Sequence, residues 1–188
     1  MKQLEEWTFS LFDSVLFDSD VCDWEKYTST FGERLFNKKQ IVILIETDDG
    51  IKFGGYVEKQ IDKVNEMIED ENIFLFTFKD NQPKKFDILD KSKGFKLYLE
   101  SIDKLFSFGD DDILVYKLNK NYSSDCKQNN NNYDYNEKNA LIGKEEFKIK
   151  HIQAFQMKEN EEMKHQKIEY NQKRKHKLEI NIKGKKEY

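Results

Sequence analysis

The alternation of apolar and polar residues predicts mainly short strands, with helices concentrated near the start of the chain. A short helix is expected at Phe31 and Leu35, because the hydroxyl of Ser29 or Thr30 can accept a hydrogen bond from the free amides of the first helical turn. Before it, apolar residues recur at steps of three and four, the period of a helix with one apolar face; they are Leu4, Trp7, Leu11, Phe12, Val15 and Leu16. Because the last of these also fit a strand, we expect a helix followed by a short extended segment.

A β-hairpin is predicted next along the chain. Residues 41–45 are mostly β-branched, as in a strand that is buried on both faces. The Asp-Gly pair at 49–50 separates them from a second apolar run at 51–57, and this arrangement is typical of a hairpin turn. Gly54 and Gly55 would weaken the second strand, unless another backbone crosses close by or a bulge is needed there.

Further strands are predicted by apolar runs at residues 73–78, 95–99, 104–108, 113–118 and 147–157. Polar residues fill 119–139, including four consecutive asparagines, and predict a long mobile loop. Strands joined by hairpins, without a regular alternation with helices, indicate a mainly antiparallel α+β domain over residues 1–157. Residues 158–188 are expected to form a protruding charged helix or a disordered tail.

Composition and charge narrow the class of protein. Of the 188 residues, 36% are charged and 14% aromatic; the aromatic rings can supply a core. The 8 glycines, single proline and two cysteines exclude a collagen and a disulfide scaffold. No apolar run approaches the roughly 20 residues of a membrane span, and the first residues lack a secretory pattern, so we expect a cytoplasmic location.

The charge is unevenly distributed along the chain. Residues 158–188 hold 10 basic and 6 acidic residues, a net +4, whereas the remaining 22 basic and 30 acidic residues give −8. An acidic body repels phosphate backbones. Contact with nucleic acid or an anionic surface would therefore depend on Lys173–Lys177 in the tail, and such charge runs are usually solvated.

Candidate metal ligands do not match the known spacings. Asp18, Asp20, Asp23 and Glu25 gather four carboxylates, but an EF-hand loop counted from Asp18 lacks an oxygen ligand at position 5 and the glycine at position 6. A solvated acidic loop is the expected interpretation. Asp110–Asp112 is interpreted as a turn before a strand. No Cys-x-x-Cys or His-x-x-x-His spacing indicates zinc.

The sequence contains no evident catalytic set. Cys22 lies among carboxylates, which would raise its pKa and reduce its reactivity, and only His151 lies in the body as a potential base. Cys126, in the predicted mobile loop, is a candidate redox thiol. No phosphate-binding glycine motif is present. We therefore expect no cofactor and no resident metal, with catalysis the less favoured hypothesis.

The order of several short motifs resembles the TLDc domain of the oxidation-resistance proteins. An aliphatic strand and acidic turn lead into Phe53-Gly54-Gly55-Tyr56, and Phe74-Leu75-Phe76 follows. Phe108-Gly109 precedes Asp112, and Leu141-Ile142-Gly143 precedes a final strand with Phe147, Gln153 and Phe155. The resemblance covers about residues 13–157.

This resemblance implies a β-sandwich of two antiparallel sheets flanked by short helices. It implies close packing at Gly54 and Gly55 and core positions for Phe74, Phe76, Phe147 and Phe155. The family commonly carries glutamate where Gln153 stands, so a role that needs this carboxylate would be lost here. The family is associated with oxidative-stress protection, and several members bind and regulate the V-type proton ATPase. The resemblance therefore implies a non-catalytic, protein-binding module, and the alternative is a thiol-dependent redox scavenger or another enzyme.

Overall fold

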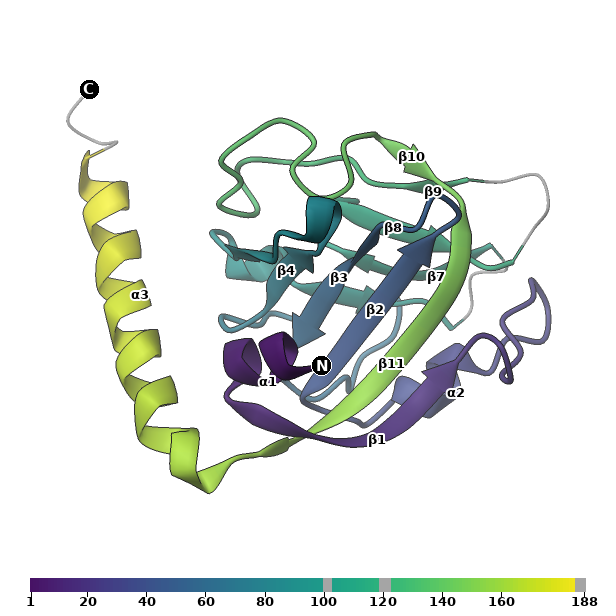
Figure 1. Cartoon of the computed structure of the whole chain (residues 1–188), viewed down its shortest axis with the longest axis horizontal. Coiled ribbons are helices and arrows are strands. Elements are labelled where there is room, and N and C mark those ends of the chain that lie inside the picture. The colour runs from purple at the N-terminus through teal and green to yellow at the C-terminus, as the bar shows by residue number, and fades with distance from the viewer. Residues whose placement is uncertain (100–102, 119–122, 185–188) are drawn as a thin grey trace. The chain divides into compact units, whose positions relative to one another are not determined.

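A computed structural model describes residues 1–99, 103–118 and 123–184. The chain divides into two compact units, one formed by Asp13–Met157 and the other by Met1–Phe12 together with Lys158–Tyr188. The expected domain comprised residues 1–157, whereas here the first twelve residues group with the C-terminal segment. The larger unit contains two antiparallel sheets with short helices, which is the predicted α+β sandwich (Figure 1).

The first sheet has six strands in the order β1-β11-β2-β3-β4-β5. Their bounds in chain order are β1 Ser10–Asp18, β2 Ile41–Thr47, β3 Lys52–Val57, β4 Phe74–Thr77, β5 Lys84–Asp87 and β11 Ile149–Glu159. The predicted hairpin is β2 and β3, which pair from Ile41 with Val57 to Glu46 with Lys52. Figure 1 shows β11 as a long curved strand between β1 and β2.

The second sheet has five strands in the order β10-β9-β8-β7-β6. These are β6 Phe95–Leu97, β7 Lys104–Phe108, β8 Ile113–Tyr116, β9 Ser124–Asp125 and β10 Glu146–Phe147. The predicted final strand at 147–157 was wrong as a single element, because Phe147 belongs to this sheet and Ile149 begins β11 in the other. Lys148 therefore lies where the chain passes from one sheet to the other.

The core of the larger unit lies between the two sheets. Phe31 of helix α2, Phe31–Leu35, stacks on Phe106 of β7 at a centroid distance of 5.1 Å. Phe53 of β3 meets Phe147 edge to face at 5.0 Å, so aromatic pairs join elements far apart in sequence. The other helical turns of this unit are η1 Lys79–Asn81 and η2 Lys91–Lys93.

The N-terminal helix is shorter than its apolar period suggested. Helix α1, Lys2–Thr8, ends where Phe9 adopts the left-handed conformation with φ 53°, and β1 begins at Ser10. The prediction of a helix followed by an extended segment is confirmed, although the strand is nine residues long. Leu11, Phe12 and Val15 are exposed and line no helix face. The period was misleading because those residues follow a left-handed residue that ends the helix.

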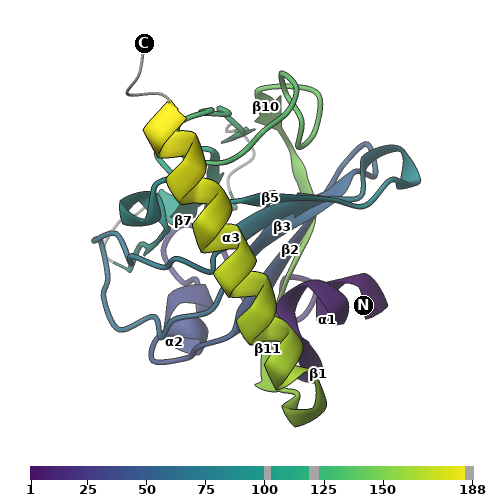
Figure 2. The same ribbon diagram turned by 90° about the vertical axis from the view of Figure 1, so that its left-hand side faces the viewer.

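The C-terminal segment is helical as far as it is described. A 3-10 turn, η3 Glu161–Met163, leads into α3, Lys164–Gly184, which Figure 2 shows as one uninterrupted helix. Within this smaller unit, Phe9 and Tyr170 bring their rings to a centroid distance of 5.6 Å. Of the two predicted states for the tail, the structure shows the helix. No helix of the described segments is long and apolar enough to cross a membrane.

Candidate functional site

The Phe-Gly-Gly-Tyr segment of β3 is a packing element. A Cβ added at Gly54 would lie 1.9 Å from the carbonyl oxygen of Ile43 on the neighbouring strand. At Gly55 it would lie 2.5 Å from the ring of Phe108 on β7, so the two sheets approach closely there. The structure buries Phe53 and Tyr56 on either side of the glycine pair. Only residues without side chains can occupy positions 54 and 55 without displacing their neighbours.

The aromatic positions of the later motifs are also buried. Phe76 lies opposite Gly54 in the pairing of β3 with β4, and Phe74 lies opposite Tyr56 with ring centroids 5.2 Å apart. The structure buries Phe74 and Phe76, and also Phe147 and Phe155 of the last motif. These side chains therefore contribute hydrophobic packing, and none of them is exposed to a ligand.

Two glycines occupy turns that need a positive φ. Gly109 has φ 65° and follows β7, and a Cβ there would lie 2.0 Å from Oδ2 of Asp112. Gly143 has φ 82°, and its amide donates to the carbonyl of Asn139 at 2.8 Å. Near the second turn, Thr77 of β4 donates a hydrogen bond to the Leu141 carbonyl at 2.6 Å. Gly109 thus shapes the turn beside Asp112, and Gly143 shapes the turn that precedes β10.

Asp112 is, like Asp70, a buried acid whose carboxylate accepts three hydrogen bonds. Its Oδ1 accepts from the Asn129 amide at 2.8 Å and from the Tyr135 hydroxyl at 2.9 Å. Its Oδ2 accepts from Nδ2 of Asn132 at 2.6 Å, and the side chain is fully buried. The interpretation of Asp110–Asp112 as only a turn missed this role. The carboxylate fastens the asparagine-rich loop to the start of β8.

Burial raises the pKa of Asp112 to about 6, although its hydrogen bonds act in the opposite direction. Because the folded pKa lies above the unfolded value, the native state binds the proton more tightly, and stability falls as pH rises between about 4 and 6. We expect wild type to lose roughly 3 kcal/mol relative to Asp112→Asn across this interval. Urea unfolding of both proteins at a series of pH values measures the difference. A pH-independent difference would contradict the assignment.

The loop predicted to be mobile is ordered from Ser123 onward, and residues 119–122 lie outside the described part. It contains β9 and the buried Asn132 and Tyr133. Asp87 of β5 and Asp134 exchange two hydrogen bonds, Asp87 N to Asp134 Oδ1 and Asp134 N to the Asp87 carbonyl, so the loop also covers the free edge of the first sheet. The prediction was wrong here because polar composition does not show that one buried carboxylate holds the segment.

Cys126 does not have the exposure that a redox thiol in a mobile loop would have. The side chain is only 3% exposed and follows β9, with its amide bonded to the Glu145 carbonyl. Burial is the main cause of a strongly raised pKa, and the charge of Asp112 adds to it. The thiolate is therefore disfavoured, and this burial does not favour Cys126 as a redox thiol.

We expect a thiol reagent to modify Cys22 at least about tenfold faster than Cys126 in the native protein, because Cys22 is only partly buried. The Cys22→Ser and Cys126→Ser variants isolate the two rates under native conditions, and denaturant should make the remaining thiols equally reactive. Comparable native rates for the two single variants would show that Cys126 is accessible.

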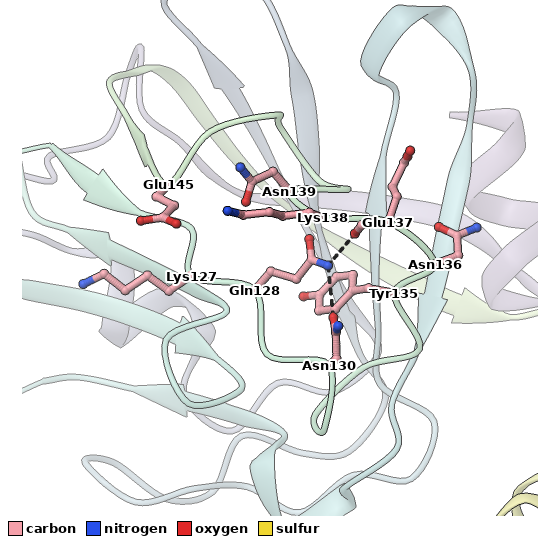
Figure 3. Close-up of a pocket in the computed structure, with 9 residues that line it drawn as sticks. All are labelled: Lys127, Gln128, Asn130, Tyr135, Asn136, Glu137, Lys138, Asn139 and Glu145. Atoms are coloured by element: carbon pink, nitrogen blue, oxygen red, sulfur yellow. Dashed lines mark hydrogen bonds between the residues drawn. The ribbon is translucent and has the colours of Figure 1, made fainter.

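A polar cavity of about 340 Å³ lies beside the asparagine-rich loop. Figure 3 shows Gln128 in its centre, directed toward Asn130 and Glu137. Nε2 of Gln128 donates to the Glu137 carbonyl at 2.6 Å and to Oδ1 of Asn130 at 3.2 Å, and its Oε1 accepts from the Ala140 amide. The central amide of this cavity is therefore already used to hold the loop together.

A second polar cluster lies at the end of β1, on the opposite margin of the first sheet. Nε2 of His151 lies 2.7 Å from Oδ1 of Asp18 and 3.6 Å from Oδ2 of Asp20. Gln153, two residues farther along β11, donates from Nε2 to Oδ2 of Asp18 at 2.7 Å. The two strands thus bring together Asp18 and His151, which are 133 positions apart.

The imidazole dominates the electrostatics of this cluster. The pKa of Asp18 is lowered to about 2, and the main cause is the hydrogen bond with His151. The hydrogen bonds from the Asp20 backbone amide and the Gln153 side-chain amide lower it further. Asp18 is therefore ionised at every physiological pH. Gln153, where the TLDc resemblance led us to expect glutamate, serves here as a donor to that carboxylate.

The sequence named Asp18, Asp20, His151 and Gln153 but did not place them together. The sequence spacing of these four residues matches no known site motif, and only the pairing of β1 with β11 brings them together. The two remaining members of the proposed acidic loop are Asp23 and Glu25, and Oδ1 of Asp23 accepts from the Glu25 amide at 2.8 Å within their own turn. The alternation of residues 151 and 153 on a predicted strand was the only available signal that those two side chains share a face.

The chain was compared with protein-family models and with curated proteins, and only the first comparison gives a match. The family model described as the TLDc domain matches residues 25–158, about 70% of the chain. The match begins after β1, includes β2 to β10 in full and covers β11 up to residue 158. No curated protein matches the chain.

Proposed function

Because the chain belongs to the TLDc domain family, we propose that it is a non-catalytic module that binds a protein partner, the V-type proton ATPase. It would act in the cytoplasm, in oxidative-stress protection or in regulation of ATPase assembly. Residues 1–157 would form the interacting domain, and 158–188 a charged appendage. The family match supports this proposal, and the following surface indicates how the module could bind.

The loop after β1 carries the observation that supports protein binding. Val21 and Tyr27 are 85% and 79% exposed, the highest values among the large apolar side chains of the described residues. Asp20, Asp23 and Glu25 lie among them and are exposed as well. An exposed aromatic and an aliphatic side chain within a charged rim have the composition of a protein-binding surface.

The polar and ionisable side chains considered as candidate site residues have structural roles. Asp112 anchors a loop, His151 and Gln153 hold Asp18, and Cys126 is buried. These contacts favour a scaffold that presents a surface over the alternative of a thiol-dependent scavenger. If cells expressing the double Cys22→Ser, Cys126→Ser variant resist peroxide as well as those with wild type, the thiol alternative is lost.

Binding to the purified ATPase tests the proposal directly. We expect the full chain to bind the enzyme and to change the fraction of assembled complex. The double variant Val21→Ser, Tyr27→Ser should bind at least about tenfold more weakly, since exposed hot-spot side chains often contribute over 1 kcal/mol each. Leu89→Ser, a substitution of another exposed apolar residue, is the matched control. Absence of binding by wild type, or equal binding by all variants, would count against the proposal.

A further inference from the structure

The cluster at the end of β1 contains three side chains with metal-binding atoms. One ligand atom from each of Asp18, Asp20 and His151 lies within 4.8 Å of the other two. They differ from a purely acidic group, because an imidazole nitrogen stands between two carboxylates. An ion at the centre could reach a mixed set of nitrogen and oxygen donors.

The backbone brings these ligands together before any ion binds. The Ser19 amide donates to the Ile152 carbonyl at 2.9 Å, and the Ile152 amide donates to Oγ of Ser19 at 3.0 Å. Beyond this point the chain turns, with the Val21 and Cys22 amides bonded to the Asp18 carbonyl. The turn places Asp20 near His151, so only the exposed Asp20 side chain has to change its rotamer when all three bind one ion.

A further set of contacts orients the Asp18 carboxylate. Gln153 donates to its Oδ2 at 2.7 Å, and the Asp20 amide donates to Oδ1 at 3.0 Å. Metal ligands in proteins are usually held by such outer hydrogen bonds. Lys150, the neighbouring cation, is paired with Glu46 at 2.6 Å. Among the described residues, this lysine is thus engaged with Glu46 and does not bridge the two carboxylates beside the imidazole.

We propose that Asp18, Asp20 and His151 bind one divalent transition-metal ion, with Zn²⁺ as the best match. An imidazole with two carboxylates suits zinc better than Mg²⁺ or Ca²⁺, which prefer oxygen ligands alone. Asp20 is 72% exposed at its side chain and can rotate inward, and the ion would replace the hydrogen bond between His151 and Asp18. Three protein ligands leave positions for water, and the ion would join the loop after β1 to β11.

Zinc titration of the full chain by calorimetry tests this site. We expect one saturable equivalent at neutral pH, and Co²⁺ in place of Zn²⁺ should give a visible absorption band typical of nitrogen and oxygen ligands. His151→Gln and Asp20→Asn should each weaken Zn²⁺ binding by about tenfold or more and remove the cobalt band. Asp20→Asn is the safer variant, because its exposed side chain can change without disturbing the core.

The other two histidines provide a matched control. His165 and His176 are exposed on α3, so the double variant His165→Gln, His176→Gln removes the same type of ligand elsewhere. It should retain the wild-type affinity and the cobalt band. Absence of saturable binding by wild type would overturn the proposal. So would an affinity that falls only in the His165, His176 variant, or one that is unchanged in both site variants.

Discussion

Replacing Gly54 with alanine is expected to destabilise the fold by about 4 kcal/mol or more, a large part of the roughly 5–15 kcal/mol by which an ordinary domain is stable. The new methyl group would lie 1.9 Å from the Ile43 carbonyl oxygen, 3.0 Å from its carbonyl carbon and 3.2 Å from the Phe76 ring. The first two atoms belong to the backbone of a central strand, β2. They cannot move aside without breaking the pairing of β2 with β3.

Gly50→Ala is the matched control for this substitution. Gly50 lies in the turn of the same hairpin with φ 86°, and nothing surrounds its Cβ position within 4 Å. Alanine there costs only the strain of a positive φ, about 1 kcal/mol. Soluble yield and urea unfolding followed by circular dichroism compare the two variants. Similar stabilities for both would show that the sheet can accommodate a side chain at position 54.

The Gly54 case shows why the hairpin could be predicted from sequence. A β-branched run, an Asp-Gly turn and a second apolar run are all local signals, and they agree with one another. The two glycines inside the second run contradicted the local preference, and that conflict pointed to the close approach that the structure shows. The agreement of these local signals, together with the exception at the two glycines, was therefore sufficient to predict the hairpin of β2 and β3.

Other elements could not be predicted because their stability comes from distant partners. β5 is Lys-Lys-Phe-Asp, which has no strand pattern, yet it pairs with β4 and with the loop through Asp134. β9 and β10 are two residues long and are defined only by their pairing. The cluster of Asp18 and His151 depends in the same way on a contact across 133 positions. Such tertiary contacts leave almost no local trace in the sequence.

Asp112 is the clearest example, because three aspartates in a row carry no sign that one of them is buried. We expect Asp112→Ala to destabilise the protein by about 4 kcal/mol at neutral pH. The Asn129 amide, Nδ2 of Asn132 and the Tyr135 hydroxyl would lose their acceptor in a buried region, at about 1–3 kcal/mol each. Relief of the cost of burying a charge offsets part of that loss.

The loss should be greatest in the asparagine-rich loop, because Asp112 is its acceptor from three directions. Amide hydrogen exchange should show reduced protection at Asn129 and Asn132, while the β2–β3 hairpin retains most of its protection under native conditions. Asp110→Ala is the control, since this exposed residue makes one surface ion pair with Lys93 and should cost less than about 1 kcal/mol. If the two substitutions are equally mild, the buried carboxylate does not hold the loop, and its order must arise from the packing of residues such as Tyr133.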